Sequence, residues 1–273
     1  MPEMPEVETI KKVLSPHIKG KIIENVKVNN EQVIATPSTE KFILLVKGKT
    51  ISNFLRRGKF LKLQFTDKSY LVIHLRMTGC LTLESSKTPY EKHTHLLLIL
   101  NDGNELRYVD TRRFGKIWFF KKENEDVSGI TKLGIEPFSS KLTLEYLKSK
   151  CKKSKKCIKE LLLNQQIIAG IGNIYSDEIL FESQILPNKL GCNLLDEEYE
   201  KLVKVIPKVL DYFIKKNTIS FEDYLLTKGK DYRNTPYLKV YGKSDSFCPK
   251  CYGLLKRMMI NGRSSVYCPH CQK

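Results

Sequence analysis

The chain has 273 residues, of which 41% are hydrophobic, and this is enough for one large or two modest domains with real cores. Its 47 Lys and Arg residues exceed its 30 Asp and Glu residues, giving a formal net charge of +17 and a pI near 9.4. This balance favours a polyanionic partner, nucleic acid ahead of an anionic membrane, although 38 of the cations are Lys and genomic composition could contribute.

The chain contains no run of about 18 apolar residues and no basic-then-apolar leader. We therefore expect a soluble, cytoplasmic protein with no membrane partner. In that compartment the four scattered cysteines should be reduced thiols; these are Cys80, Cys151, Cys157 and Cys192.

The first segment, MPEMPEVETIKKVLSPH, predicts a helix with its apolar residues on one face. Pro5 suits the first helical turn, and Ser15-Pro16 should end the helix. Pro2 and Glu3 then lie just outside the helix N-terminus. Because Met1 before a proline is normally removed, Pro2 could expose a secondary amine, which is either a trivial helix entry or a nucleophile.

From about residue 20 to 122 the pattern changes to short β-rich runs, including KFILLV, FLKLQF, YLVIHL and HLLLIL. Turn signals such as Arg57-Gly58 and Asp102-Gly103 separate them. This half therefore predicts an antiparallel sandwich or barrel.

Three turns in this half carry polar or bulky side chains. RRGKFL places Lys59 after a glycine turn, while HLRMTG offers Met77 and DTRRFG offers Arg112 and Phe114. An apolar residue and an arginine at loop tips suit entry into a duplex to fill the gap left by an extruded base. Taken singly, Met77 and Phe114 are more often core residues.

After a linker near LGIEPFSSK the pattern becomes helical, ending in a long amphipathic stretch over 196–216. Residues 217–240 have no clear periodicity, and so long a loop inside a compact domain is usually functional or disordered. In the glycine turn IIAGIGNIYSDE, Gly170 and Gly172 allow close backbone approach. Asn173 could cap the next helix and leave N–H groups facing an anion.

The pairs CPKC and CPHC, sixteen residues apart, are the most specific pattern in the chain. Two knuckles supply four thiolates, which suit one tetrahedral structural zinc ion with no open position. The proposed ligands are Cys248, Cys251, Cys268 and Cys271. Asn261-Gly262 between the pairs predicts a two-stranded hairpin, with Arg263 at its tip facing a phosphate or a base, or simply solvent.

Over essentially its full length the chain resembles the formamidopyrimidine-DNA glycosylase and endonuclease VIII family. The resemblance rests on six motifs in the same order: MPEMPEVE, LRRGKFL, HLRMTG, DTRRFG, AGIGNIYSDE and the four-cysteine ribbon. PEMPEVET, with Met77, Arg112 and Phe114, favours the formamidopyrimidine branch. The resemblance implies an α+β fold with an N-terminal antiparallel β-sandwich and flanking helix (1–132), a helix-two-turn-helix DNA-binding domain (133–240) and a zinc finger (241–273).

The resemblance also implies a function, the excision of oxidised purines from damaged duplex DNA. The Pro2 amine would attack C1′, displace the base and form an iminium that leads to strand cleavage by β,δ-elimination, so the chain would be a bifunctional glycosylase and abasic-site lyase. By the same resemblance, Glu3 moves protons at the sugar, Lys59 contacts the lesion and the adjacent phosphate, and Glu6 holds the N-terminal segment.

Phosphate contacts are implied for a second set of residues, in which the two histidines are as readily structural. The set is Lys159, Asn173, Tyr241, Arg263, His74 and His93. With Pro2, Glu3 and Lys59, Arg263 is also expected in the catalytic site. One structural zinc ion and a monomer complete the expectation.

One stretch and two single residues depart from the family pattern. KKNTISFEDY stands where a Gly-Gly-Thr-Thr-like loop usually begins, Asn164 replaces an Asp, and Lys243 ends VYGK where Arg is common. These departures bear on lesion preference, so endonuclease VIII-like action on oxidised pyrimidines is an alternative. A non-catalytic nucleic-acid-binding zinc protein is another, although such a binder would need neither Pro2, Glu3 nor Lys59.

Overall fold

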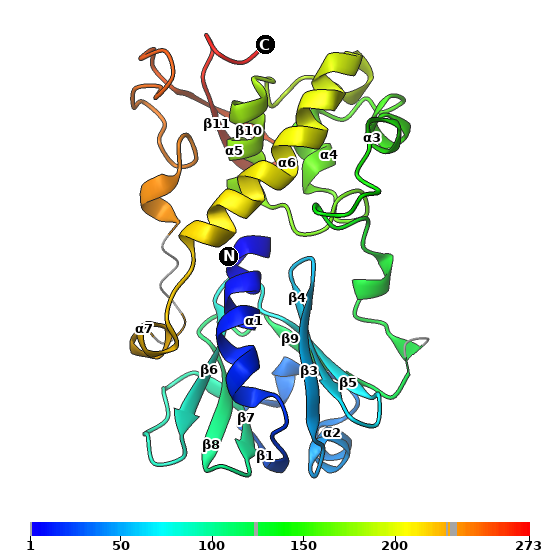
Figure 1. Cartoon of the computed structure of the whole chain (residues 1–273), viewed down its shortest axis with the longest axis vertical. Coiled ribbons are helices and arrows are strands. Elements are labelled where there is room, and N and C mark those ends of the chain that lie inside the picture. The colour runs from blue at the N-terminus through cyan, green and yellow to red at the C-terminus, as the bar shows by residue number, and fades with distance from the viewer. Residues whose placement is uncertain (1, 123–124, 228, 230–233) are drawn as a thin grey trace. The chain divides into compact units, whose positions relative to one another are not determined.

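The computed structural model of the protein describes residues 2–122, 125–227, 229 and 234–273. It divides into two compact units (Figure 1). The first comprises Met1–Pro2, Glu6–Thr131 and Asn217–Tyr232, and the second comprises Glu3–Pro5, Lys132–Lys216 and Arg233–Lys273. Two short segments therefore belong to a different unit from their sequence neighbours, and the four-cysteine segment lies within the second unit.

The first helix, α1 (Met4–Ile18), is longer than the sequence predicts, and the expectation that Ser15-Pro16 ends it was wrong. Pro16 lacks an N–H and so cannot donate to the carbonyl of Lys12, but Lys12 is exposed, so water can take the place of that donor. Ile18 is fully buried and holds the last turn against the core. The helix is followed by Gly20, whose φ of +81° suits a glycine.

Two sheets form the β-sandwich of the first unit, as predicted. One has the order β1-β7-β8-β6 and the other β2-β9-β5-β4-β3. Their strands are β1 (Ile23–Val28), β6 (Gly79–Ser85), β7 (Thr94–Leu100) and β8 (Asn104–Asp110), then β2 (Ile34–Thr36), β3 (Ile51–Arg57), β4 (Phe60–Phe65), β5 (Tyr70–His74) and β9 (Lys116–Phe120). The pairs are antiparallel except that β2 runs parallel to β9, where the prediction was purely antiparallel.

The core of the first unit contains residues from both sheets and one face of α1. Val7, Ile10 and Leu14 are fully buried there, among strand residues such as Leu63 and Leu98. The flanking α1 is thereby fixed to the sandwich by apolar burial. The remaining short elements are η1 (Glu31–Val33), α2 (Thr39–Val46) and η3 (Ile130–Lys132).

Residues 217–227 are more ordered than the sequence predicts, because they contain α7 (Phe221–Leu226). Residues 228 and 230–233 of the predicted 217–240 loop lie outside the described residues. The Ser220 hydroxyl caps it by accepting from the N–H of Asp223 at 3.0 Å. Tyr224 is buried and donates its hydroxyl to the carbonyl of Leu81 at 2.6 Å, and Phe221 stacks on His17. Apolar packing on the sandwich, rather than helical periodicity, makes this segment part of the first unit.

The second unit is built on α5 (Asn173–Ser183) and α6 (Asp196–Lys216), the long yellow helix of Figure 1. The apolar stripe of α6 is buried as predicted, and α6 packs against both α3 and α5. The other elements are α3 (Leu144–Cys151), α4 (Ile158–Leu163), η4 (Gly191–Asn193), η5 (Thr235–Tyr237), β10 (Lys256–Ile260) and β11 (Arg263–Tyr267). No helix in the described ranges is long and apolar enough to cross a membrane.

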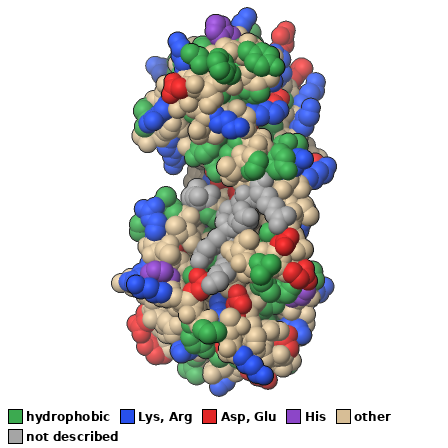
Figure 2. Space-filling view, turned by 90° about the vertical axis from the view of Figure 1, so that its left-hand side faces the viewer, with side chains coloured by type: hydrophobic (Ala, Val, Ile, Leu, Met, Phe, Trp, Pro, Cys, Tyr) green, Lys and Arg blue, Asp and Glu red, His purple; other side chains and the backbone are tan. Residues whose placement is uncertain are grey.

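Positive side chains do not gather in one place on the face that Figure 2 draws. Figure 2 shows Lys and Arg side chains on both units of the face drawn, with a few acidic side chains between them. The net charge of +17 alone therefore does not mark a binding site, and the site must be built from particular residues.

Candidate functional site

Glu3 caps a helix that lies 170 residues further along the chain. Its carboxylate accepts the backbone N–H of Ile174 at 2.9 Å and that of Tyr175 at 3.4 Å, at the N-terminus of α5. The Met4 N–H donates to the carbonyl of Gly170 at 3.1 Å, so the backbone beside Glu3 is fixed to the same turn. Glu3 is buried, and its position is set by α5 rather than by α1.

The glycine turn before α5 is shaped by this carboxylate. A Cβ at Gly172 would lie 2.2 to 2.6 Å from the Glu3 carboxyl atoms, so residue 172 must be glycine for Glu3 to sit there. The expectation that Asn173 caps α5 was wrong, because Gly172 is the N-cap and Asn173 is already helical. The N–H groups of Ile174 and Tyr175, predicted to face an external anion, instead bind the chain's own carboxylate.

The hairpin that carries Arg263 is fastened to α4 and α5. Asn261 and Gly262 both have positive φ, as a tight two-residue turn requires, and Arg263 is exposed beside them. The carbonyl of the next residue, Ser264, accepts from Lys159 Nζ at 2.9 Å and from Asn173 Nδ2 at 3.2 Å. Three of the residues predicted to bind phosphate therefore meet in the second unit.

Lys159, which is predicted to contact a phosphate, does not reach solvent in this structure. Its side chain is fully buried and pairs with Asp177 at 2.7 Å. Asp177 also accepts from the Ser265 hydroxyl at 2.6 Å and the Val266 N–H at 3.0 Å. Burial lowers the pKa of the Lys159 amine, and the adjacent Asp177 carboxylate opposes that shift. The pair is an internal support for β11.

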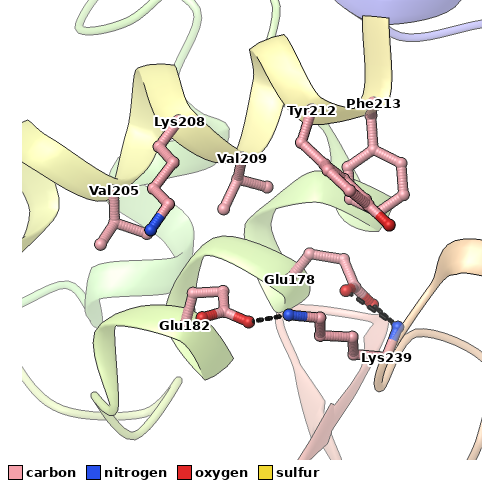
Figure 3. A pocket seen from close by; sticks show the side chains of 8 residues that line it. All are labelled: Glu178, Glu182, Val205, Lys208, Val209, Tyr212, Phe213 and Lys239. Atoms are coloured by element: carbon pink, nitrogen blue, oxygen red, sulfur yellow. Dashed lines mark hydrogen bonds and ion pairs between the residues drawn. The ribbon is translucent and has the colours of Figure 1, made fainter. Parts of the chain in front are cut away.

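Tyr241 is positioned by Glu178 of α5. The buried Glu178 carboxylate accepts the backbone N–H groups of Lys239, Val240 and Tyr241 at 2.9 to 3.1 Å. Burial raises its pKa, while the three N–H groups act in the opposite direction. A pocket of about 310 Å³ lies beside it, lined by α5, α6 and Lys239 (Figure 3). Since Glu178 and Glu182 are already bonded to the 239–241 segment, this pocket presents no free acidic group.

In the first unit, Lys59 follows the tight β3–β4 turn, where Gly58 has a φ of +55°. Arg56 fixes that turn by donating to the Gly58 carbonyl at 3.1 Å and to Glu8 of α1 at 2.7 Å. Burial acts to raise the pKa of Glu8, but hydrogen bonds from Lys11 and Arg56 hold it below its usual range. Lys59, largely buried, is thus tied through its turn to α1.

Glu6 is a buried residue of the same helix, and it bonds to Asn217, the first residue of the 217–227 segment. Its Oε1 accepts from Asn217 Nδ2 at 3.3 Å, and Thr9 donates to the Asn217 carbonyl at 3.4 Å. Asn217 lies in KKNTISFEDY, the stretch that departs from the family pattern. The bond is consistent with the structural role predicted for Glu6.

His74, at the end of β5, is a neutral hydrogen-bonding group. Burial, with the nearby positive charges of Arg76 and Lys59, lowers its pKa from 6.5 to about 3. Its Nδ1 accepts the backbone N–H of Arg76 at 3.0 Å, which leaves the proton on Nε2. His74 can therefore offer a phosphate an N–H donor but no charge at neutral pH.

The three predicted wedge residues come together at two loop tips. Met77 is 44% exposed and Phe114 is 49% exposed, so neither is a core residue. Arg112 lies between them, with Nη1 3.1 Å from the Met77 sulfur and the guanidinium 4.7 Å from the Phe114 ring centre. His93, the half-buried residue just before β7, accepts the N–H of Asp110 on its backbone carbonyl at 3.0 Å.

The four terminal cysteines form a cluster that could hold a metal ion, with all four sulfurs within 4.8 Å of one another. The Cys248–Cys271 and Cys251–Cys268 sulfur pairs are 3.8 and 3.5 Å apart. Zn–S bonds of about 2.3 Å in a tetrahedron place sulfurs about 3.8 Å apart. The cluster therefore fits the size of such an ion, and it leaves no position for a substrate.

Similarity to known proteins in sequence and fold shows which family the chain belongs to. The Formamidopyrimidine-DNA glycosylase N-terminal domain matches residues 1–117, and the Formamidopyrimidine-DNA glycosylase H2TH domain matches residues 133–223. The chain belongs to the formamidopyrimidine-DNA glycosylase family. It is accordingly a DNA glycosylase of base excision repair, in a family whose enzymes are also abasic-site lyases.

Individual relatives of this glycosylase cover the whole chain. The formamidopyrimidine-DNA glycosylase of Carboxydothermus hydrogenoformans is 44% identical over 273 residues, 100% of both chains, and that of Bacillus cereus is 38% identical over 275 residues, 100% of this chain and 99% of the relative. A solved Lactococcus lactis enzyme with DNA containing FAPY-dG is 32% identical with a TM-score of 0.90, covering 99% of this chain and 100% of that one.

Several residues that organise the glycosylase site carry no signal of their own in the sequence. Glu8 and Arg56 form their bond across 48 positions, and Asp177 and Glu178 look like ordinary helix surface residues in IYSDE although both are buried. Asp110, the first residue of DTRRFG, is fully buried as well. The one signal in the sequence that could have pointed to these buried residues is that they are acidic and lie inside or beside the recognised motifs.

Proposed function

We propose that this glycosylase excises oxidised purines, formamidopyrimidines and 8-oxoguanine, from duplex DNA and then cleaves the strand at the resulting abasic site. The observation that carries the proposal is the capture of Glu3 at the N-terminus of α5, directly beside Pro2. A buried carboxylate held by two backbone N–H groups is pre-organised for proton transfer at one position. A helix entry would require no such arrangement.

In the proposed reaction the nucleophile is the amine that Pro2 exposes once Met1 is removed. Its lone pair attacks C1′, the bond from C1′ to the base breaks, and the base leaves with a proton. Opening of the sugar ring and loss of the amine proton give an iminium. Loss of a C2′ proton then expels the 3′ phosphate, and a second elimination expels the 5′ phosphate, with Glu3 moving protons at the sugar.

The remaining residues are proposed to bind the duplex. Lys59 contacts the lesion and the adjacent phosphate, and His74 and His93 donate N–H groups. Arg263, Asn173 and Tyr241 bind phosphates, with Lys159 supporting Arg263 from below. Met77, Arg112 and Phe114 fill the gap left by the extruded nucleotide. The proposed domains are 1–132, 133–240 and 241–273.

The metal proposed for the cysteine cluster is zinc. It would fold the 248–271 segment and so hold the Arg263 hairpin, without taking part in the reaction. We further propose that the protein acts as a monomer on damaged duplex DNA in the bacterial cytoplasm. Its relatives at 38 to 44% identity are bacterial enzymes.

Oxidised pyrimidines are a second candidate class of substrate. A Lactococcus lactis relative, 32% identical with a TM-score of 0.90, has been solved with DNA containing an oxidised pyrimidine, and the 217–226 segment of this chain departs from the family pattern. The deciding experiment is single-turnover excision with borohydride trapping on matched duplexes containing 8-oxoguanine, a formamidopyrimidine, 5-hydroxycytosine or no lesion.

We expect covalent trapping on both purine lesions at rates at least 10-fold above those on the pyrimidine lesion, and none on intact DNA. Faster trapping on the pyrimidine would assign the chain to the alternative class. Binding to all duplexes with no trapping on any would contradict a catalytic role.

A further inference from the structure

The two loops that carry the wedge residues share one buried anchor. Met77 lies in the loop between β5 and β6, and Arg112 and Phe114 lie in the loop between β8 and β9. Their mutual contacts are exposed, and such contacts hold side chains only weakly. Something beneath the surface must therefore set the two tips at one spacing.

Asp110, at the end of β8, has a fully buried carboxylate with four donors. Oδ1 accepts from the Thr78 hydroxyl and from the Arg112 N–H at 3.1 Å. Oδ2 accepts from the Tyr108 hydroxyl and from the Gly115 N–H, both at 2.9 Å. The Arg112 N–H also lies 3.1 Å from the Thr78 hydroxyl, so one carboxylate joins both loops directly.

Tyr108 fills the space beneath both loops. A Cβ at Gly115 would lie 1.8 Å from the Tyr108 hydroxyl oxygen, and one at Gly79 would lie 2.7 Å from it and 2.5 Å from the Leu75 carbonyl oxygen. The two glycines, each at the end of one loop, are therefore matched to this one ring. Burial and the Asp110 carboxylate raise the pKa of Tyr108, so its hydroxyl stays protonated and donates.

The backbone of each loop is held in an unfavourable conformation. Arg76 and Arg113 have φ angles of 56° and 58°, which non-glycine residues rarely adopt. Such conformations persist where the surroundings over-determine them. Each strained residue stands next to a wedge residue, and the bonds of Asp110 fall on both sides of Arg113.

We propose that Tyr108 and Asp110 form a brace that fixes the two wedge loops as a single unit, so that Met77, Arg112 and Phe114 enter the duplex together. Because both brace residues are buried, they act as positioning residues and touch no DNA. The inference rests on the wedge role proposed above and deepens it.

Asp110→Asn is the sharpest test, because the amide keeps the shape but replaces one acceptor oxygen with an N–H₂ group. The hydroxyls of Thr78 and Tyr108 can rotate to accept, whereas the backbone N–H of Arg112 or Gly115 cannot, so one end of the loop must come loose. Thr78→Val is a milder second variant, since it removes only the link between the loops. Asp102→Asn, at the opposite end of the same β7–β8 pair, is the matched control.

Each protein is assayed in single turnover on an 8-oxoguanine duplex and on a single-stranded abasic site, where no stack needs filling. A 2-aminopurine next to the lesion reports wedge insertion through its fluorescence. We expect Asp110→Asn to slow duplex excision about 10-fold or more and to reduce the fluorescence change, with single-strand cleavage within about 2-fold of the wild type. Thr78→Val should show the same pattern less strongly, and Asp102→Asn should not show it.

Met77→Ala separates the two hypotheses. If Met77→Ala loses duplex excision selectively and Asp110→Asn and Thr78→Val do not, the brace is wrong. If Met77→Ala itself shows no duplex-specific loss, the wedge role fails instead. Should Asp110→Asn not fold, Thr78→Val decides alone, and an equal loss on both substrates overturns the brace. Combining Met77→Ala with Thr78→Val should slow excision no further than Met77→Ala alone, because both remove one joint action.

Discussion

The carboxylate of Glu3 occupies the space that a side chain at residue 172 would need. A Cβ on Gly172 would come within 2.2 Å of the Glu3 carboxyl carbon, while the carboxylate oxygens accept the N–H groups of Ile174 and Tyr175 in the first turn of α5. The glycine turn and the N-terminal segment thus form one arrangement. The position of Glu3, beside the proposed nucleophile, therefore depends on the absence of a side chain at Gly172, 169 residues away in the sequence.

Gly172→Ala should therefore abolish base excision without unfolding the protein. Its φ is not in the left-handed region, so alanine is compatible with the backbone, and only the clash with Glu3 remains. Displacing a proton-transfer group costs about 100-fold or more in rate. Single-turnover excision on an 8-oxoguanine duplex measures the loss.

Gly48→Ala is the control for that change. Gly48 has a φ of +79° and open space around it, so alanine there costs about 1–2 kcal/mol of stability while leaving Glu3 in place. It should lower the melting temperature and keep normal excision. Normal excision by Gly172→Ala would show that Glu3 needs no fixed position.

The motifs were predictable from the sequence because each is short and local. The strands, the Asn261-Gly262 hairpin and the paired cysteines follow from turn residues and spacing within a few positions. The positions of Glu3, Lys159 and α7 were not predictable, because they depend on contacts between distant parts of the chain. Lys159 shows this most clearly: a lysine in a basic region is expected at the surface, and only the structure shows that it pairs with the buried Asp177.

Acidification should destabilise the protein through His74. Its pKa is 6.5 in the unfolded chain and about 3 in the folded one, so below pH 6.5 the unfolded state takes up a proton that the folded state refuses. The free energy of unfolding should fall by about 1.4 kcal/mol per pH unit between those values, about 2 kcal/mol at pH 5. Urea denaturation from pH 7.5 to 5 measures this slope.

His74→Asn should remove most of that slope, because the amide oxygen can still accept the Arg76 N–H and does not titrate. His17→Asn, at a partly exposed histidine on α1, should keep it. An unchanged slope in His74→Asn would mean that other groups govern the acid sensitivity.

Cys268→Ser should lose the metal and most of the DNA affinity, while the β-sandwich unit stays folded. Structural sites of four thiolates supply folding free energy to the segment that they cross-link, and that segment carries Arg263. Metal content by emission spectroscopy and duplex affinity by fluorescence anisotropy measure the two losses. Cys192→Ser, outside the cluster, should change neither. A metal-free protein with full affinity would exclude a structural role for the metal.

Lys159→Met should destabilise the protein by about 3–5 kcal/mol, because the Asp177 carboxylate is left buried without its cation. DNA affinity should fall as β11 loosens. Adding Asp177→Asn removes the stranded charge, so the double variant should recover most of both losses. Unfolding in urea and affinity for a duplex with an abasic analogue report them. If Lys159 instead gripped a phosphate, affinity would stay low in the stable double variant.

The last prediction concerns the Pro2 amine. One covalent intermediate is proposed for base removal and for strand cleavage, so blocking the amine should abolish both together. A cleavable N-terminal tag supplies the block, since it converts the amine into an amide nitrogen whose lone pair is delocalised. Tag removal that leaves Pro2 first, verified by mass spectrometry, should restore both activities in the same preparation. Glu3→Gln should retain DNA affinity yet lose base excision, because its shape is kept while proton transfer is not.

If Pro2 were only a helix entry, the tagged protein would show normal activity and slightly altered stability. The measurement is borohydride trapping on one 8-oxoguanine duplex, and a covalent adduct formed by the tagged protein would rule out Pro2 as the nucleophile.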